Sequence, residues 1–132
     1  MPQCACNIPA SDLLAMLDRI KRGGGFTYNP RTQRFVTGSG YVVANPPGGV
    51  SRTSSSGYAI GVRAILALSA DSPLLDRPGF YLGAWKDDGR VYAEISQVFR
   101  SRAEALRVAA DRGERAIYDL RNRRDIPVAR VA

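Results

Sequence analysis

The sequence predicts a single α+β domain, and three observations support this fold class. The chain has 132 residues, of which 45% are hydrophobic and 23% charged, as in a globular domain that can bury a core. Two segments carry apolar residues at helical spacing between start and stop signals. Short runs rich in β-branched and aromatic residues, bounded by turn residues, indicate strands between and after these segments.

Residues 1–10 are predicted to be a mobile terminus, and residues 11–132 are predicted to be the domain. The two cysteines, Cys4 and Cys6, are one residue apart, where a disulfide would be strained. A metal site built on them would need carboxylates or a second chain, because the sequence has no histidine. We therefore expect no metal and no cofactor.

Neither a secretion signal nor a membrane span is predicted. The first residues lack a basic start followed by an apolar run, and the longest apolar stretch, Tyr58–Ala70, is short and broken by Gly61 and Arg63. We expect a cytoplasmic protein. The net charge of +7, carried by 17 arginines and two lysines, permits attraction to nucleic acid or to an acidic protein. A GC-rich coding sequence accounts for the arginines equally well.

The first helix is predicted over Ser11–Lys21, with Ser11 as its cap and Gly23-Gly24-Gly25 as its end. Its apolar face comprises Leu13, Leu14, Met16, Leu17 and Ile20. The glycines can act as a hinge, so the helix either packs on its own domain, which is the arrangement that we expect, or reaches another chain.

The next part of the chain gives weaker signals. Phe26–Tyr28 and Gly40–Ala44 are predicted strands that could pair as a hairpin, and residues 45–57 are predicted to be a surface loop. For Tyr58–Ser69 the helical spacing favours a helix, although a buried strand also fits its apolar run. A loop is expected from Ser72 to Gly79.

The clearest segment is a hairpin that follows Phe80. Asp88-Gly89 fits a two-residue turn, which pairs Asp87 with Arg90 and fixes the register of the strands beyond it. One face then carries the pairs Trp85–Tyr92, Gly83–Glu94 and Tyr81–Ser96, and the other face carries Ala84–Ala93 and Leu82–Ile95. We expect helices to cover the second face, which is small and aliphatic.

The C-terminal part predicts a capped helix between two strands. Ser101-Arg102-Ala103-Glu104 matches a capping box, and Gly113 ends a helix whose small-residue face comprises Ala103, Leu106, Ala109 and Ala110. Ala116–Leu120 is a predicted strand and Arg121–Asp125 a turn. Ile126–Val131 is a predicted edge strand, because Pro127 cannot donate a hydrogen bond to a sheet.

The order of these elements indicates a known arrangement. From Tyr41 onward it is strand, helix, strand, strand, helix, strand. This βαββαβ order is the split βαβ pattern of a ferredoxin-like sandwich, here with an extra N-terminal helix and strand and a C-terminal edge strand.

Four segments together resemble a family of small proteins encoded by mycobacteriophages and other actinobacterial mobile elements. In that family a Gly-x-Trp strand, an acidic-Gly turn and an Ala-rich helix precede an Ala-Ile-x-Asp-Leu strand. The matching segments are Tyr81–Trp85, Asp88–Tyr92, Ser101–Leu106 and Arg115–Leu120. Glu94 departs from the pattern, which has an aspartate there. The resemblance implies a phage or prophage origin and supplies no catalytic residues.

The predicted binding surface is the aromatic face of the hairpin, with Tyr81, Trp85, Tyr92 and Glu94. Arg90 and the basic turn with Arg121, Arg123 and Arg124 are placed to flank the same sheet. Such a face suits a protein partner, because aromatic residues and arginine are frequent anchors of interfaces. A small phage protein is expected to occupy a host protein, and a second copy of the chain is another possible partner.

Single-stranded nucleic acid is the alternative partner, since bases stack on aromatic rings and arginines meet phosphates. Glu94 argues against it by repelling phosphate. Mutual stacking of the aromatic rings, or their burial by Phe26, Tyr28 and the first helix, would explain them without any ligand.

Catalysis has little support in the sequence. Asp87 and Asp88 fit a turn better than an acid–base pair, and no nucleophile has an activating base. Glu94 and Asp119 could meet on neighbouring strands beside Tyr118, which is a possible proton donor. We predict a binding protein without enzymatic activity.

Overall fold

The computed structural model describes residues 8–22, 24–47, 51–54, 65–70, 72–87 and 90–129, and it confirms an α+β fold. The helical elements are α1 (Ala10–Lys21), residues 65–70, the 3-10 helix η1 (Pro73–Asp76) and α3 (Arg102–Asp111). The strands are β1 (Phe26–Asn29), β2 (Arg34–Phe35), β3 (Tyr41–Ala44), β4 (Ser51–Ser54), β5 (Tyr81–Asp87), β6 (Arg90–Phe99), β7 (Ala116–Asp119) and β8 (Arg124–Pro127). None of the described helices is long and apolar enough to cross a membrane.

The strands form one curled antiparallel sheet in the order β2-β1-β5-β6-β3-β7-β8, with β4 also paired to β6. The long strand β6 is central: β4 pairs with its first half, and β3 pairs with its second half. After β3 the chain separates from β6 at Asn45, whose N–H donates to the carbonyl of Ile95 at 2.9 Å. It pairs with β6 again from Ser51, as strand β4. Strand β4 lies where a surface loop was predicted.

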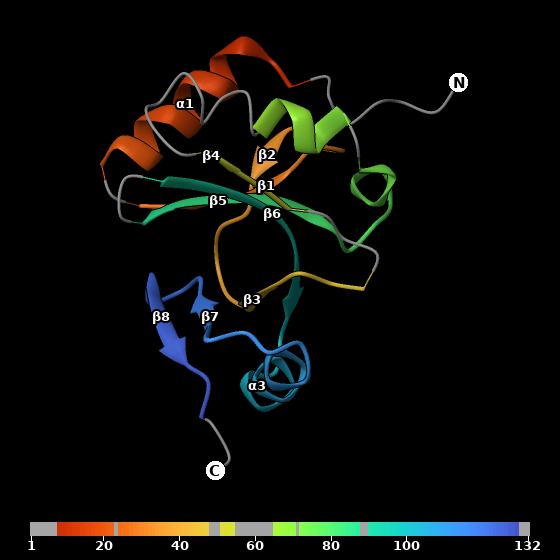
Figure 1. Cartoon of the computed structure of the whole chain (residues 1–132), viewed down its shortest axis with the longest axis vertical. Helices are drawn as coiled ribbons and strands as arrows, with labels where there is room; N and C mark the ends of the chain where they lie inside the picture. Colours follow the sequence, from red (N-terminus) through yellow and green to blue (C-terminus); the bar gives the residue numbers. More distant parts are fainter. Residues whose placement is uncertain are drawn as a thin grey trace.

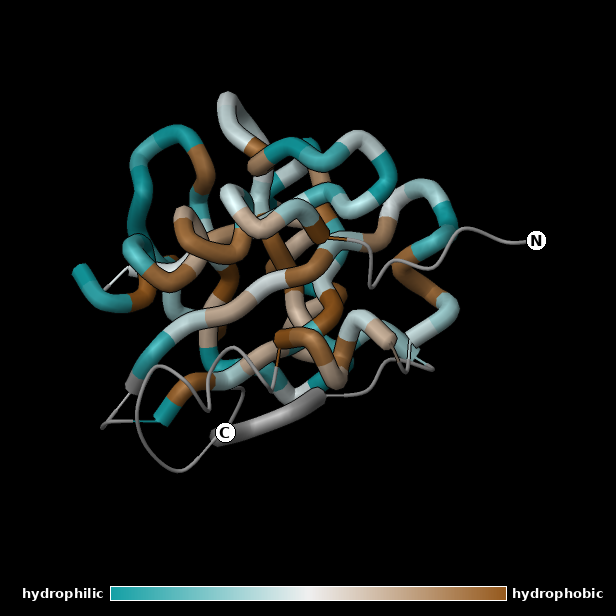
Figure 2. The backbone as a smooth tube through the Cα atoms, turned by 90° about the horizontal axis from the view of Figure 1, so that it is seen from above, coloured by the Kyte–Doolittle hydropathy of each residue, from teal (hydrophilic) through white to brown (hydrophobic). Residues whose placement is uncertain are grey.

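The covered face of the sheet carries Leu82 and Ala84 of β5 and Val91, Ala93 and Ile95 of β6. These side chains pack with buried residues of α1, of the helix at 65–70 and of η1, as Figure 1 shows for the first two helices above β5. The second core lies where Ala105 and Ala109 of α3 meet β3, β7 and β8 (Figure 1). Figure 2 shows hydrophobic segments gathered centrally, with hydrophilic turns around them.

The register of the β5–β6 hairpin is the predicted one, from Tyr81 opposite Ser96 to Asp87 opposite Arg90. The Asp88-Gly89 turn itself lies outside the described residues. Ser101 caps α3 as predicted, because its hydroxyl accepts the N–H of Glu104 at 3.1 Å. At the other end Gly113, at φ 73°, forms the expected helix stop. The predicted face of α3 is partly wrong, since Ala105 and Ala109 are buried, whereas Ala103 and Ala110 are exposed.

Helix α1 starts one residue before its predicted position and has Pro9 rather than Ser11 at its cap. Met16 and Ile20 are buried against β1 and β5, so the helix packs on its own domain, as expected. Leu14 is 68% exposed and stands outside this core. Residues 65–70 are helical, in agreement with the helix predicted for Tyr58–Ser69, whose first part lies outside the described residues. Cys4 and Cys6 also lie outside them.

The predicted pairing of Phe26–Tyr28 with Gly40–Ala44 is wrong, because β1 turns back at once into β2. The Asn29 side-chain oxygen accepts the N–H groups of Arg31 and Thr32, at 3.0 and 3.3 Å, and Gln33 adopts φ 57°. The β7–β8 hairpin repeats this turn with Asp119, Arg121, Asn122 and Arg123 in the corresponding positions. The same turn therefore occurs twice, once in the sequence Tyr28-Asn29-x-Arg31 and once in Tyr118-Asp119-x-Arg121.

The two hairpins differ in how they join the neighbouring strand. Leu120 donates its N–H to the carbonyl of Gly40 at 3.0 Å. Pro30 takes the corresponding place opposite Phe80 and has no N–H to donate. The Arg31 guanidinium instead donates to the carbonyls of Phe80 at 2.6 Å and Leu75 at 2.9 Å. The hydrogen bonds of Arg31 therefore connect η1 to the sheet. Arg121, at the corresponding position of the other hairpin, is exposed.

Stability at alkaline pH should depend on Tyr28, which is fully buried and donates its hydroxyl to a carboxylate oxygen of Asp12. Burial, together with the hydrogen bond to Asp12 and its charge, raises the pKa of Tyr28 well above the usual value. The unfolded chain ionises near its ordinary pKa of about 10, so this contribution is present below that pH and is lost as the pH rises further. We expect Tyr28→Phe to cost about 1–2 kcal/mol at neutral pH and to flatten the loss of stability above pH ~10. Urea unfolding across that pH range tests both effects, and an unchanged slope would contradict the assignment.

Candidate binding face

The open face of β5 and β6 carries Tyr81, Trp85, Tyr92 and Glu94, the four residues that the sequence placed together. The buried side chains of α1, of the helix at 65–70 and of η1 pack against the covered face instead. Phe26 and Tyr28 also belong to that core, so they do not bury the aromatic residues of the open face. Trp85 is 41% exposed.

Trp85 and Tyr92 stack on each other, as one interpretation of the sequence anticipated. Their ring centroids are 4.5 Å apart and their planes differ by 16°. The indole N–H of Trp85 also donates to Oε2 of Glu94 at 3.3 Å. The indole is thus fixed by a neighbouring ring and a carboxylate while a large part of its surface stays accessible.

Glu94 is a half-buried carboxylate whose surroundings oppose its charge. Burial is the main cause that raises the pKa of Glu94, and the negative charge of Glu114 acts in the same direction. The hydrogen bond from Trp85 lowers this pKa and the nearby amide of Asn45 acts in the same direction, but the net shift is upward. Gly83 lies opposite Glu94 and leaves the sheet surface free of a side chain there.

Two residues of this site, Asn45 and Glu114, were not predicted from the sequence. Asn45 stands at the break between β3 and β4 with φ 58°, and its amide nitrogen donates to both carboxylate oxygens of Glu114 at 3.2 Å. Arg112, just before Glu114, donates to the Ala44 carbonyl at 3.3 Å and to the Gln97 side chain. Only the fold brings these segments together, and the sequence holds no local signal for it.

The predicted arginines do not gather at the aromatic pair. Arg90 starts β6 on the open face, opposite Asp87. Arg121 and Arg123 lie in the β7–β8 connection and Arg124 starts β8, across β3 from β6 and near the end of β6 that is remote from Trp85. They flank the same sheet, as predicted, but at its other end.

The possible meeting of Glu94 and Asp119 is wrong. Strand β3 separates their strands, and Tyr41, the partner of Asp119, lies opposite Phe99 rather than Glu94. Asp119 instead accepts hydrogen bonds from Arg121 and Asn122, which lower its pKa. Its carboxylate therefore has a structural role in the turn.

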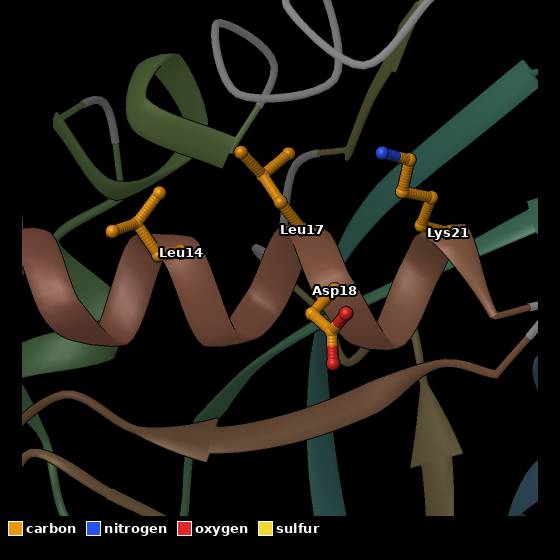
Figure 3. Close-up of a pocket in the computed structure, with 4 residues that line it drawn as sticks. All are labelled: Leu14, Leu17, Asp18 and Lys21. Carbon is orange, nitrogen blue, oxygen red and sulfur yellow. The ribbon is translucent and has the colours of Figure 1, made fainter.

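A second surface feature is an open depression of about 270 Å³ on α1, lined by Leu14, Leu17, Asp18 and Lys21. Figure 3 shows Leu14, Leu17 and Lys21 projecting from one side of the helix, with Asp18 turned away from them. The depression has no convergent set of polar groups of the kind that orients a small ligand. Within the described part of the chain, no three acidic side chains gather as a metal site would require.

Comparison of the chain with protein-family models, curated proteins and solved structures finds no match.

Proposed function

We propose that this protein is a non-enzymatic binding module that engages another protein through its open face. The observation that carries the proposal is Trp85, which is 41% exposed and yet held in one orientation by Tyr92 and Glu94. A side chain that is already fixed loses little conformational entropy on binding. Tryptophan is also among the residues that dominate the binding energy of interfaces.

We also propose the origin and the fold family that the sequence suggests. A phage or prophage accessory protein acting in the cytoplasm of its bacterial host would have a host protein as its partner. The spatial order β5-β6-β3-β7 is the one that a ferredoxin-like split βαβ fold requires, with β1, β2 and β8 added at the edges. Such a fold hosts many functions and does not select one.

A protein partner fits this face better than nucleic acid. Glu94 lies directly beside the exposed indole, and Glu114 is near enough to affect the pKa of Glu94. A phosphate backbone that approaches Trp85 would meet these negative charges. The three arginines of the β7–β8 hairpin lie too far along the sheet to offset them at that point.

Capture from lysate tests the proposal. Immobilised wild-type protein, Trp85→Ala and Leu14→Ala are exposed to nuclease-treated and untreated lysate of a mycobacterial host. Leu14 is the matched control, because it is also a large exposed apolar residue but lies on α1. We expect wild-type and Leu14→Ala proteins to retain the same partner, and Trp85→Ala to lose at least about thirtyfold in affinity, as an anchor residue should.

Two results would contradict the proposal. Retention that disappears after nuclease treatment would favour a nucleic-acid-binding protein. Retention that depends on Leu14 and not on Trp85 would move the interface from the sheet to α1.

A further inference from the structure

Glu94 is an unusual carboxylate for so basic a chain. The protein carries a net charge of +7, and yet no cationic side chain of the described residues forms a salt bridge with Glu94. Its described hydrogen-bond partner is the neutral indole N–H of Trp85.

The carboxylate keeps capacity for a further partner. An ionised carboxylate offers about four lone-pair positions, and the described hydrogen bond from Trp85 uses one of them. Glu114 adds a second negative charge near Glu94, and Arg112 lies close to Glu114 in turn. A positive group brought to this position would relieve the cost of keeping Glu94 charged while it is half-buried.

The indole beside Glu94 defines the shape of that positive group. One face of the Trp85 ring rests on Tyr92, and the side chain keeps 41% of its surface exposed. A planar cation can lie on an aromatic ring and reach an adjacent carboxylate at the same time. Guanidinium fits these demands better than ammonium, because it is flat, weakly hydrated and able to donate two parallel hydrogen bonds.

We propose that Trp85 and Glu94 bind the guanidinium of an arginine side chain presented by a segment of another polypeptide, stacked on the indole and paired with the carboxylate. This inference deepens the proposed function and rests on it. Charge complementarity selects the occupant: Glu94, directly beside the exposed indole, favours a cationic side chain and disfavours a phosphate.

The single tryptophan makes the site directly observable, because Trp85 is the source of the one indole N–H resonance of the protein. The probe is the peptide acetyl-Gly-Arg-Gly-amide, titrated into ¹⁵N-labelled protein at low salt. Matched peptides carry lysine or the neutral isostere citrulline in place of arginine. Glu94→Gln is the matched variant, since its amide oxygen can still accept the hydrogen bond from Trp85.

We expect the arginine peptide to shift the indole resonance saturably, with the lysine peptide binding several-fold more weakly and the citrulline peptide not binding. Glu94→Gln should weaken the arginine peptide by about tenfold, which is the usual size of one charge-assisted hydrogen bond. Binding of arginine and citrulline peptides with equal affinity, or equal binding by Glu94→Gln, would overturn the inference.

Two further outcomes separate this inference from the proposed function. Trp85-dependent capture of a host protein together with no response to the arginine peptide would overturn the arginine assignment alone. An indole shift that depends on protein concentration without peptide, and that Glu94→Gln abolishes, would place an arginine of a second copy in the site and overturn the assignment to a different polypeptide.

Discussion

Arg31→Ala is expected to lower the free energy of unfolding by about 2–3 kcal/mol, although Arg31 is one of 17 arginines in a strongly basic chain. Its guanidinium donates to the carbonyls of Leu75 and Phe80. Pro30, which lies opposite Phe80, has no N–H, so Arg31 supplies the hydrogen bond to the Phe80 carbonyl. Removing it leaves two partly buried acceptors without their donor. Desolvation by burial lowers the pKa of Arg31, which is consistent with a guanidinium recruited into the fold.

Arg121→Ala is the control, because Arg121 holds the same place in the corresponding β7–β8 turn. The N–H of Leu120 already bonds the neighbouring strand there, so we expect a change within about 0.5 kcal/mol. Urea denaturation of both variants measures the difference. Equal effects of the two substitutions would show that the carbonyl contacts of Arg31 contribute nothing to stability.

The hairpins of the sheet show what the sequence can and cannot predict. The β5–β6 register was predictable, because a two-residue turn fixes every pair beyond it and the two faces differ in composition. The β1–β2 turn was missed because Gln33, with φ 57°, carries no glycine signal. The pattern Tyr-Asx-x-Arg-x-x-Arg, present at Tyr28 and again at Tyr118, could have identified it.

Strand β4 and the contacts around Glu94 could not be predicted from short sequence patterns. Ser51–Ser54 has no alternation of apolar residues, and its strand conformation comes from pairing with β6. Asn45 and Glu114 meet beside the adjacent strands β3 and β7, and the break after Asn45, where the chain leaves β3, has no signal in the sequence. Trp85, Tyr92 and Glu94 were predictable as neighbours because they share one hairpin.

Two adjacent glycines after α1 should respond in opposite ways to alanine. A Cβ on Gly25 would lie 2.7 Å from the backbone oxygen of Ala84 and 3.1 Å from Cβ of Trp85. A Cβ on Gly24 would meet only the Arg19 oxygen, at the ordinary distance of 3.5 Å. Gly25 thus permits the close approach of the chain to β5, a role that its interpretation as a hinge did not include.

We expect Gly25→Ala to destabilise the protein by about 1–3 kcal/mol, because the obstacle is backbone of the central sheet and not a side chain that can move aside. Gly24→Ala should leave stability unchanged or raise it by up to ~1 kcal/mol, since alanine restricts the unfolded chain. The strand that Gly25→Ala displaces also carries the binding face, so the indole resonance of Trp85 should shift in this variant and stay in place in Gly24→Ala. Denaturant unfolding and the indole spectrum measure the two effects together. A Gly25→Ala protein with wild-type stability and an unmoved indole signal would mean that the close contact between Gly25 and β5 does not position Trp85.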